Sequence, residues 1–315
     1  MKNIDHSLLA ERARNIPLYL HAYAFHLNMR YERLIPSDLL DIAHQQSLRG
    51  VKIHVEDGES QSLQKLSLGE LTKFKLKAQE YDLDIHIETS ASDKATLDEA
   101  IRIAKATGAS SIRFYPRYEG HLYDVMAKIS GDLDYLRQYD NCGLSFTIEQ
   151  HEDLKSHELV TLVKNSGMKN LSILFDFANM INANELPLSA LDAMAPYITQ
   201  VHVKDAKIIR EGSGYAHEAC RTGHGDLPIK ELLVKLLMLG QKRQQITAFG
   251  LEEEVDYYAP AFRFDEEDGN PWIPWRDASL TPLPDAEYLE ERLKLEKKHA
   301  LDQITYIRNL CEELT

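Results

Sequence analysis

The feature that most constrains the fold is a regular alternation of short apolar runs with longer amphipathic segments. Eight runs are typical of buried β-strands, because they are short, mainly apolar or β-branched, and bounded by polar residues. They cover residues 18–25, 50–55, 83–88, 111–116, 143–149, 171–177, 198–204 and 246–252. Strands that alternate with helices imply βαβ units and a parallel sheet.

Several segments between these runs have recognisable helix ends. Residues 67–70 form a capping-box sequence, and 92–108 begins with a serine cap and ends at a glycine. The segment 158–167 also ends at a glycine, and 226–240 has an aspartate cap, a proline near its start and a glycine at its end. A last helix is predicted over 285–310.

Eight βα units predict a closed (β/α)₈ TIM barrel, and the 315 residues form one domain of suitable length. The alternative is an open doubly wound sheet, but the first strand is not followed by the GxGxxG motif of its dinucleotide-binding form. Residues 257–284 fit no unit and are rich in proline, aromatic and acidic residues. We expect this segment to be an arm or lid over a barrel mouth, with Trp272 and Trp275 as anchors, followed by a C-terminal helix over 285–315.

The net charge of −14 argues against nucleic acid or an anionic membrane as the main partner. Three cysteines without a CxxC pair favour a reducing cytoplasm, and the N-terminus lacks the apolar core of a signal peptide. No apolar run is long enough to span a membrane. The sequence leaves homo-oligomerisation open.

Four successive strands present a potential ligand at their carboxyl ends, where the chemistry of a barrel lies. These residues are Glu149, Asp176, His202 and Glu252. Each alone is more often a cap, a solvated residue or a core imidazole, but the joint pattern is stronger. Three carboxylates in one mouth repel each other, which a divalent cation would relieve. Three oxygen donors and one imidazole suit Mn²⁺, Mg²⁺ or Co²⁺, with Zn²⁺ or Fe²⁺ as alternatives.

The motifs TIEQHEDL, FDFANM, VHVKDAK and TGHGDLPIKELL resemble those of the xylose isomerase-like TIM barrels, the sugar phosphate isomerase/epimerase family. The resemblance implies one metal ion bound by Glu149, Asp176, His202 and Glu252, with both glutamates as acid and base. It also implies that Arg221, before the glycine-rich turn, contacts substrate. The chain departs from the DNA-repair endonuclease branch, which uses more histidines to bind several zinc ions.

Such a site predicts an isomerase or epimerase that acts on a sugar or sugar derivative through a metal-stabilised enediolate. One glutamate removes a proton, and the other returns it to the opposite face or to the neighbouring carbon. A lyase on the same site, either a dehydratase or a decarboxylase of a 3-oxo sugar acid, is the alternative. A non-catalytic binding barrel is disfavoured because all four ligand positions are intact.

Further candidates for substrate contacts lie on the same rim. Lys204 is in phase with His202, and His151 is in phase with Glu149. The opposite wall carries His54, Glu88 and Arg113, for which a structural role is slightly favoured over a substrate contact. Basic residues in the mouth, namely Lys204, Arg221 and Arg113, favour an acidic substrate. Asp205 is interpreted as a partner of a metal ligand or as a loop cap, and the turn at Gly223–Gly225 as a weak phosphate cradle.

Overall fold

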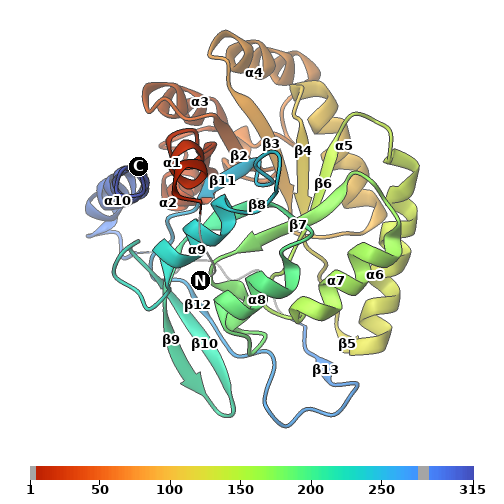
Figure 1. Ribbon diagram of the computed structural model, residues 1–315. Helices are drawn as coiled ribbons and strands as arrows, with labels where there is room; N and C mark the ends of the chain where they lie inside the picture. The colour runs from red at the N-terminus through yellow and green to blue at the C-terminus, as the bar shows by residue number, and fades with distance from the viewer. Residues whose placement is uncertain (1–4, 276–283) are drawn as a thin grey trace.

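The computed structural model describes residues 5–275 and 284–315. Its central strands are β1 (Leu18–His21), β2 (Gly50–His54), β3 (Asp84–Thr89), β4 (Ser111–Phe114), β6 (Ser145–Glu149), β7 (Leu171–Asp176), β8 (Ile198–Val203) and β11 (Ala248–Leu251). They form a closed barrel in the order β1-β11-β8-β7-β6-β4-β3-β2, with all pairs parallel (Figure 1). Each strand overlaps one of the predicted runs, so the TIM-barrel prediction is confirmed.

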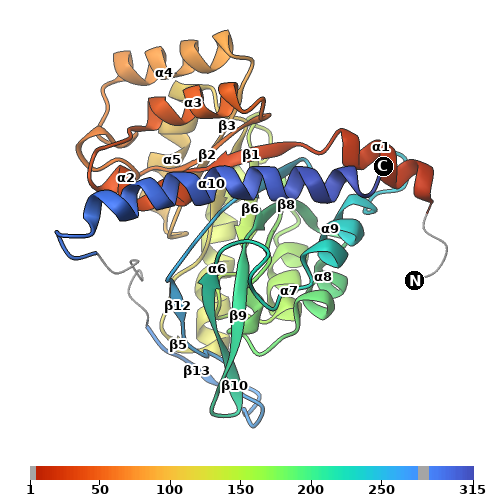
Figure 2. The same ribbon diagram turned by 90° about the vertical axis from the view of Figure 1, so that its left-hand side faces the viewer.

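Helices surround the barrel on its outer side (Figure 1). They are α1 (His6–Arg14), α2 (His26–Arg30), α3 (Pro36–Gln45), α4 (Leu68–Glu80), α5 (Lys94–Thr107), α6 (Leu122–Leu136), α7 (Ser156–Ser166), α8 (Pro187–Met194), α9 (Ile229–Leu237) and α10 (Leu289–Glu312). The long C-terminal helix α10 packs against α1 and α2 along one side of the molecule (Figure 2). None of the described helices combines the length and apolar composition that crossing a membrane requires.

Local signals set the helix ends, with two exceptions. Ser67 and Glu70 form the predicted capping box of α4. Helix α5 begins one residue later than predicted, because Asp93 accepts the terminal amide hydrogen bonds while the Ser92 hydroxyl donates to another carboxylate. Helix α9 begins at Ile229 rather than at the predicted aspartate cap, since that aspartate accepts a hydrogen bond from a neighbouring strand instead.

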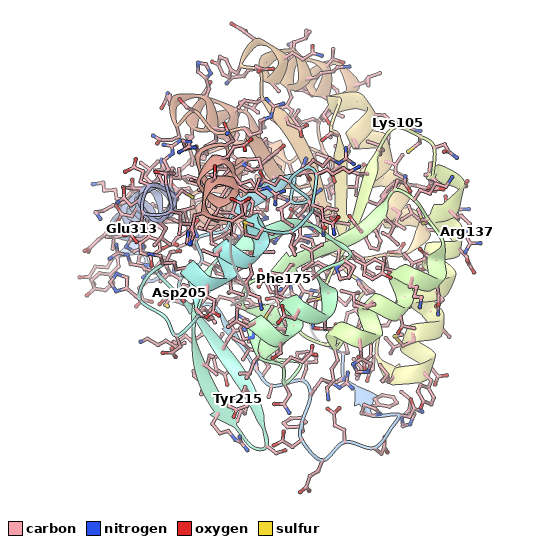
Figure 3. The ribbon with its side chains drawn as sticks, in the orientation of Figure 1. Lys105, Arg137, Phe175, Asp205, Tyr215 and Glu313 are labelled. Atoms are coloured by element: carbon pink, nitrogen blue, oxygen red, sulfur yellow. The ribbon has the colours of Figure 1, made fainter. Side chains whose placement is uncertain are left out.

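Alternation along the strands divides apolar from polar side chains. The outward rows are apolar and fully buried against the helices, as with Phe146, Ile173 and Phe175, and Figure 3 shows Phe175 deep inside the molecule. The inward rows are unusual for a barrel, where branched apolar residues normally fill the interior. Here Lys52 and His202 lie inside with no solvent exposure. The interior of this barrel is therefore polar at its centre instead of being filled by apolar side chains.

An antiparallel hairpin extends from the end of β8, which the sequence pattern did not reveal. It comprises β9 (Asp205–Glu211) and β10 (Gly214–Cys220), and β12 (Tyr258–Ala259) adds a third strand. A second small sheet pairs β5 (Gly120–His121) with β13 (Trp272–Ile273). Figure 2 shows both sheets below the barrel, on the side opposite α3 and α4. Residues 258–273 therefore join two loops that follow different barrel strands.

Besides the strand pairings of β12 and β13, Arg263 attaches the segment predicted as an arm to the barrel. This guanidinium is buried and donates to both carboxylate oxygens of Glu158 on α7, at 2.8 and 3.0 Å. The expected anchors behave differently, since Trp272 is 54% exposed and Trp275 is 51% exposed. The part of the predicted arm from 276 to 283 lies outside the described residues.

Candidate active site

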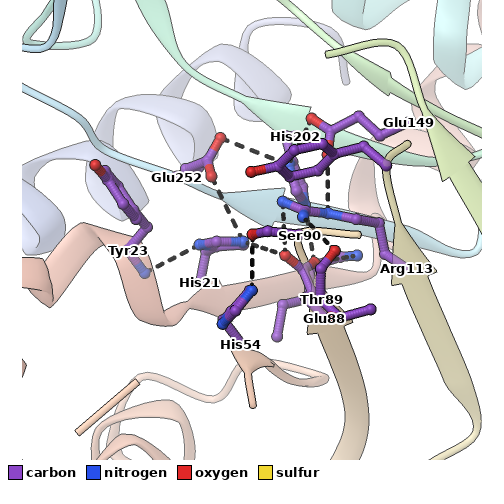
Figure 4. Close-up of polar contacts among 12 residues, drawn as sticks. His21, Tyr23, His54, Glu88, Thr89, Ser90, Arg113, Glu149, His202 and Glu252 are labelled. Carbon is purple, nitrogen blue, oxygen red and sulfur yellow. Dashed lines mark hydrogen bonds and ion pairs between the residues drawn. The ribbon is translucent and has the colours of Figure 1, made fainter. Parts of the chain in front are cut away.

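The four predicted metal ligands meet at the carboxyl end of the barrel. Glu149 and Asp176 end β6 and β7, His202 lies near the end of β8, and Glu252 directly follows β11. Nδ1 of His202 is 3.5 Å from Oε1 of Glu149 and 3.5 Å from Oε2 of Glu252, as Figure 4 shows. Asp176 is the register partner of His202. The ligand atoms of Glu149, Asp176 and His202 all lie within 4.8 Å of one another.

The donor atoms in this group are suited to a cation. Nδ1 of His202 is buried and has no hydrogen-bond partner in the described part of the chain. Oδ2 of Asp176 and Oε2 of Glu252 are buried without a hydrogen bond there as well, and each lies 3.2 Å from the Lys204 ammonium. Two carboxylate oxygens and an imidazole nitrogen that converge in this way are the kinds of atom that a divalent cation binds. The other atoms of these groups are already held: Oδ1 of Asp176 accepts from the backbone amides of Ala178 and Asn179. The residues therefore fit a divalent metal ion.

Glu88 orients the imidazole of His202 so that Nδ1 faces the other candidate ligands. Its Nε2–H donates to Oε1 of Glu88 at 3.0 Å, which leaves Nδ1 facing the other carboxylates. A carboxylate behind a histidine is a common support for metal binding. Although burial lowers it, the charges of Glu88, Glu252 and Glu149 raise the pKa of His202 to about 9. The same negative surroundings would attract a cation.

Lys204 places its ammonium group among these carboxylates. Its Nζ lies 3.2 Å from Oδ2 of Asp176, 3.2 Å from Oε2 of Glu252 and 3.3 Å from Oε2 of Glu254. These contacts raise the pKa of Lys204 well above its ordinary value despite burial. Burial raises the pKa of Asp176 to about 6 and of Glu254 to about 7, although Lys204 lowers both. Lys204 is thus a fixed positive charge beside the candidate metal ligands.

Glu88 is the centre of a buried charge network rather than a free group on the substrate wall. Its carboxylate accepts from Nε2 of His21 at 2.9 Å and lies 3.3 Å from Nζ of Lys52 and 3.0 Å from a terminal nitrogen of Arg113 (Figure 4). Arg113 contributes most, with His21, His202 and Lys52, to holding the pKa of Glu88 well below its ordinary value, although burial opposes ionisation. A second group of potential ligands, formed by His21, Glu88 and His202, shares this carboxylate. Its oxygens already contact Lys52 and Arg113, which makes them poor ligands for another cation.

Arg113 connects this network to Glu149. Its Nε lies 2.8 Å from Oε2 of Glu149, and a second guanidinium nitrogen faces Glu88. Burial favours the protonated form of Glu149, but Arg113 and His202 lower its pKa to about 2. Burial likewise opposes ionisation of Glu252, whose pKa is lowered by Lys204 and His202. Both glutamates are therefore ionised at neutral pH.

A cavity of about 160 Å³ opens beside these residues. Of the predicted contacts, it is lined by Glu149, Glu252, His54, Glu88, Arg113, His151 and Lys204. The ring of His151 stacks on Tyr115 with centroids 3.9 Å apart. Arg221 is not among the lining residues, because its guanidinium turns outward and bonds to Asp302 on α10 at 3.0 Å. The structure thus brings the predicted residues together with the exception of Arg221.

Asp205 serves the backbone rather than the site. Its Oδ2 accepts hydrogen bonds from the amides of Gly223 and Gly225, at 2.9 and 2.8 Å. A Cβ at position 225 would lie 2.1 Å from the Asp205 carboxylate, so glycine is required there. The glycine turn is already occupied by this side chain, and the interpretation of it as a phosphate cradle is wrong.

Several residues of the site were not identified from the sequence. His21, Lys52 and Glu254 contact the ionised groups, and Asn179 donates to Oε1 of Glu149 at 3.1 Å. Inward phase would have indicated Lys52, because it precedes His54 by two residues on the same strand. Gly250 in the sequence also points to Lys52. A Cβ at position 250 would lie 2.6 Å from the Lys52 side chain, so glycine is needed there to leave room for the lysine inside the barrel.

Comparisons with known proteins agree with this architecture. The model of the xylose isomerase-like TIM barrel family matches residues 40–253. Uncharacterized protein YihM of Escherichia coli strain K12 is 61% identical over 307 residues, which cover 97% of this chain and 94% of that protein. The 3-oxo-isoapionate decarboxylase of Pectobacterium atrosepticum is 23% identical over 168 residues, covering 52% of this chain and 60% of the decarboxylase.

Solved structures show the same fold at low identity. The IolI protein with a bound zinc atom superposes with a TM-score of 0.58 at 13% identity, covering 92% of this chain and 99% of that one. D-psicose 3-epimerase, solved in the presence of D-fructose, gives a TM-score of 0.55 at 12% identity, with 76% of this chain and 85% of the epimerase covered. At such identities the likeness concerns the fold alone. Because the family model spans most of the barrel, the chain belongs to the family of xylose isomerase-like TIM barrels.

Proposed function

We propose that this protein is a divalent-metal-dependent isomerase or epimerase of a sugar or sugar derivative. The observation that carries the proposal is the convergence of buried carboxylate oxygens of Asp176 and Glu252 with the unpaired Nδ1 of His202. Glu149 lies beside them, and Lys204 forms ion pairs with Asp176 and Glu252. Mn²⁺, Mg²⁺ and Co²⁺ suit this donor set best, and Zn²⁺ and Fe²⁺ are alternatives. The fold likeness to an epimerase and to a zinc-binding protein supports the same reaction class.

The two glutamates are the proposed proton carriers. When bound, the cation would supply positive charge for a carbonyl oxygen of the substrate and its neighbouring hydroxyl. Glu149 and Glu252 approach Nδ1 of His202 from separate strands, and a substrate between them would meet one carboxylate on each side. Both are ionised, so either can remove the proton next to the carbonyl. Return of the proton to the other face gives an epimer, and return to the adjacent carbon gives an isomer.

A lyase is the second candidate, and Lys204 is the observation that favours it. Its protonated amine lies 3.2 Å from Glu252 and remains charged at neutral pH. An ammonium there can donate a proton to a carbon that has lost CO₂, which a decarboxylase of a 3-oxo sugar acid requires. The partial similarity to 3-oxo-isoapionate decarboxylase points in the same direction.

One experiment tests the proposal and separates these reactions. The protein, loaded with Mn²⁺ or Co²⁺, is incubated in D₂O with ketoses, sugar phosphates and 3-oxo sugar acids, and deuterium and CO₂ are measured together. An isomerase or epimerase places deuterium beside the carbonyl and approaches an equilibrium mixture. Irreversible release of CO₂ would replace the first candidate with the second.

Variants at the two glutamates test their roles. Glu149→Gln and Glu252→Gln should each remove nearly all turnover even where metal content is retained, because an amide can coordinate but cannot accept a proton at neutral pH. Glu119→Gln is the matched control, since Glu119 is exposed at the surface. Turnover close to that of the wild type in either site variant, at equal metal content, would exclude that glutamate as a proton carrier.

A further inference from the structure

Most positive charges around the cavity are already neutralised by the protein. Lys204 contacts Asp176, Glu252 and Glu254, and Arg113 contacts Glu149 and Glu88. These two residues therefore give weak support for an acidic substrate, although the sequence favoured it on their account. An anionic substrate would need a cation that the protein leaves without a carboxylate.

Arg117 is such a cation within the described ranges 5–275 and 284–315. It follows β4 on the loop that borders the cavity, and its side chain is partly exposed. No carboxylate of the described residues forms an ion pair with it; its hydrogen bond is donated to the Tyr115 hydroxyl at 3.1 Å. The guanidinium also lies 5.5 Å from the centre of the Tyr115 ring. Tyr115 therefore fixes the position of Arg117 without neutralising it.

Tyr115 lies close to both Arg117 and Arg113, the arginine that contacts the candidate metal ligand Glu149. The Arg113 guanidinium, which contacts Glu149, lies 5.2 Å from the centre of the same Tyr115 ring. Arg117 and the candidate ligands Glu149 and Glu252 line one cavity, so a molecule bound there can contact both. The ring of His151, stacked on Tyr115, lines the same cavity.

Two hydroxyl groups near Arg117 are oriented by their partners. Nδ1 of His54 accepts from the backbone amide of Glu56, so Nε2 carries the proton and donates to Oγ of Ser90 at 2.8 Å. Burial and the charges of Arg113 and Arg117 keep the pKa of His54 low, at about 3, and the imidazole neutral. The Ser90 hydroxyl then retains its own hydrogen as a donor. The Tyr115 hydroxyl, which accepts from Arg117, likewise retains its hydrogen.

We propose that Arg117, together with the hydroxyls of Ser90 and Tyr115, forms a subsite for the negatively charged end group of the substrate. The end group is a carboxylate or a phosphate, so the substrate is a sugar acid or a sugar phosphate rather than an uncharged sugar. All three residues line one cavity with the candidate metal ligands Glu149 and Glu252. The assignment of substrate class rests on the proposed function, whereas anion binding itself does not.

Direct binding tests the subsite without any reaction. Inorganic phosphate and glycolate are titrated into the metal-loaded protein by calorimetry, for the wild type, Arg117→Met and Arg102→Met. Arg117→Met should weaken both anions by at least about tenfold, since a charge-assisted pair is lost. Arg102 is the matched control, because it pairs with Glu99 on the outer surface of α5. Equal affinities of wild type and Arg117→Met, or no binding to the wild type, would overturn the subsite.

Kinetics then separates the two end groups and the two proposals. Arg117→Met should raise KM at least about tenfold more for an acidic substrate than for its uncharged counterpart. Comparison of sugar acids with sugar phosphates identifies the end group that is used. Arg117-dependent phosphate binding without turnover of any panel compound would retain the subsite and refute the proposed function. Turnover with equal KM changes for charged and uncharged substrates would retain the function and refute the subsite.

Discussion

Replacing Glu88 by glutamine should damage both the stability of the barrel and its affinity for metal. The Glu88 carboxylate is fully buried and contacts His21, Lys52, Arg113 and His202 within 3.3 Å. Glutamine keeps the shape of the side chain but removes the negative charge. Two separate effects follow, because the cations around Glu88 lose their counter-charge and His202 loses its carboxylate acceptor.

The size of the stability effect follows mainly from Lys52. Its amine has no solvent exposure, and burial already lowers its pKa. Without the Glu88 carboxylate, the hydrogen bond that remains to it within residues 5–275 and 284–315 goes to the side-chain oxygen of Gln200 at 2.7 Å. Removing one partner of a buried ion pair costs about 3 to 5 kcal/mol. Arg113 contributes less, because it keeps its contact with Glu149. We therefore expect Glu88→Gln to lower the free energy of unfolding by about 3 to 5 kcal/mol.

The metal effect is independent of that cost. Loss of the group that orients a ligating histidine reduces metal affinity by roughly 10- to 100-fold. The double variant Lys52→Met/Glu88→Gln separates the two effects, because it also removes the uncompensated cation. It should recover much of the stability, yet its affinity for Co²⁺ should remain as low as that of the single variant.

Urea unfolding followed by circular dichroism measures the first effect, and competition with a chelating dye measures the second. Glu119→Gln controls for the chemistry of the substitution. Wild-type Co²⁺ affinity in folded Glu88→Gln or in the double variant would refute the role assigned to Glu88 behind His202. An unfolding midpoint unchanged from the wild type would refute the charge network as a stabilising element.

Three further predictions concern the metal, the arm and pH. Elemental analysis should find about one divalent cation per chain after loading, reduced in Asp176→Asn and His202→Gln; no uptake of Mn²⁺ or Co²⁺ by the wild type would contradict the site. Asn182→Ala removes a hydrogen bond to the Ala259 carbonyl, so proteolysis within the arm should become faster and KM should rise. An unchanged cleavage rate and an unchanged KM would show that the arm is not needed at the barrel mouth. Burial lowers the pKa of His217 from 6.5 to about 3. The unfolded chain therefore binds a proton first as the pH falls below 6.5, and the free energy of unfolding decreases by about 5 kcal/mol by pH 3. Unfolding of His217→Gln should lack this part of the pH dependence.

The strands of the barrel were predictable because their signal is local. Each run alternates or is continuously apolar over a few residues, which a single sequence displays directly. The β9–β10 hairpin was missed because its strands mix charged residues such as Lys207 and Arg210 with small buried ones such as Ala216 and Ala219. Small residues give only a weak apolar period, so the alternation does not stand out in the sequence. The exposed tryptophans of the arm show the same limit, because aromatic character alone does not indicate what a side chain contacts.

The proximity of the four candidate metal ligands was also predictable, because each lies at or next to the carboxyl end of its strand. Their partners were not, since contacts across a barrel join residues that are far apart in the chain. Glu88 and His202 meet at 3.0 Å, although 114 residues separate them. The alternation along β3 correctly predicts that Glu88 points into the barrel. Whether Glu88 contacts a substrate or the protein's own cations depends on residues from other strands, which the sequence pattern does not reveal.

This distinction changes what the charges imply about the substrate. The sequence counts Lys204, Arg113 and Arg221 as three basic groups available to an acid, yet two of them contact carboxylates in the site and the third bonds to Asp302 outside it. Arg117 did not stand out in the sequence, because it lies on a loop without periodicity. A charge acts on a substrate only when the protein leaves it uncompensated and accessible. By this criterion, Arg117 is the residue proposed to select an anionic substrate, and Lys204, Arg113 and Arg221 are not.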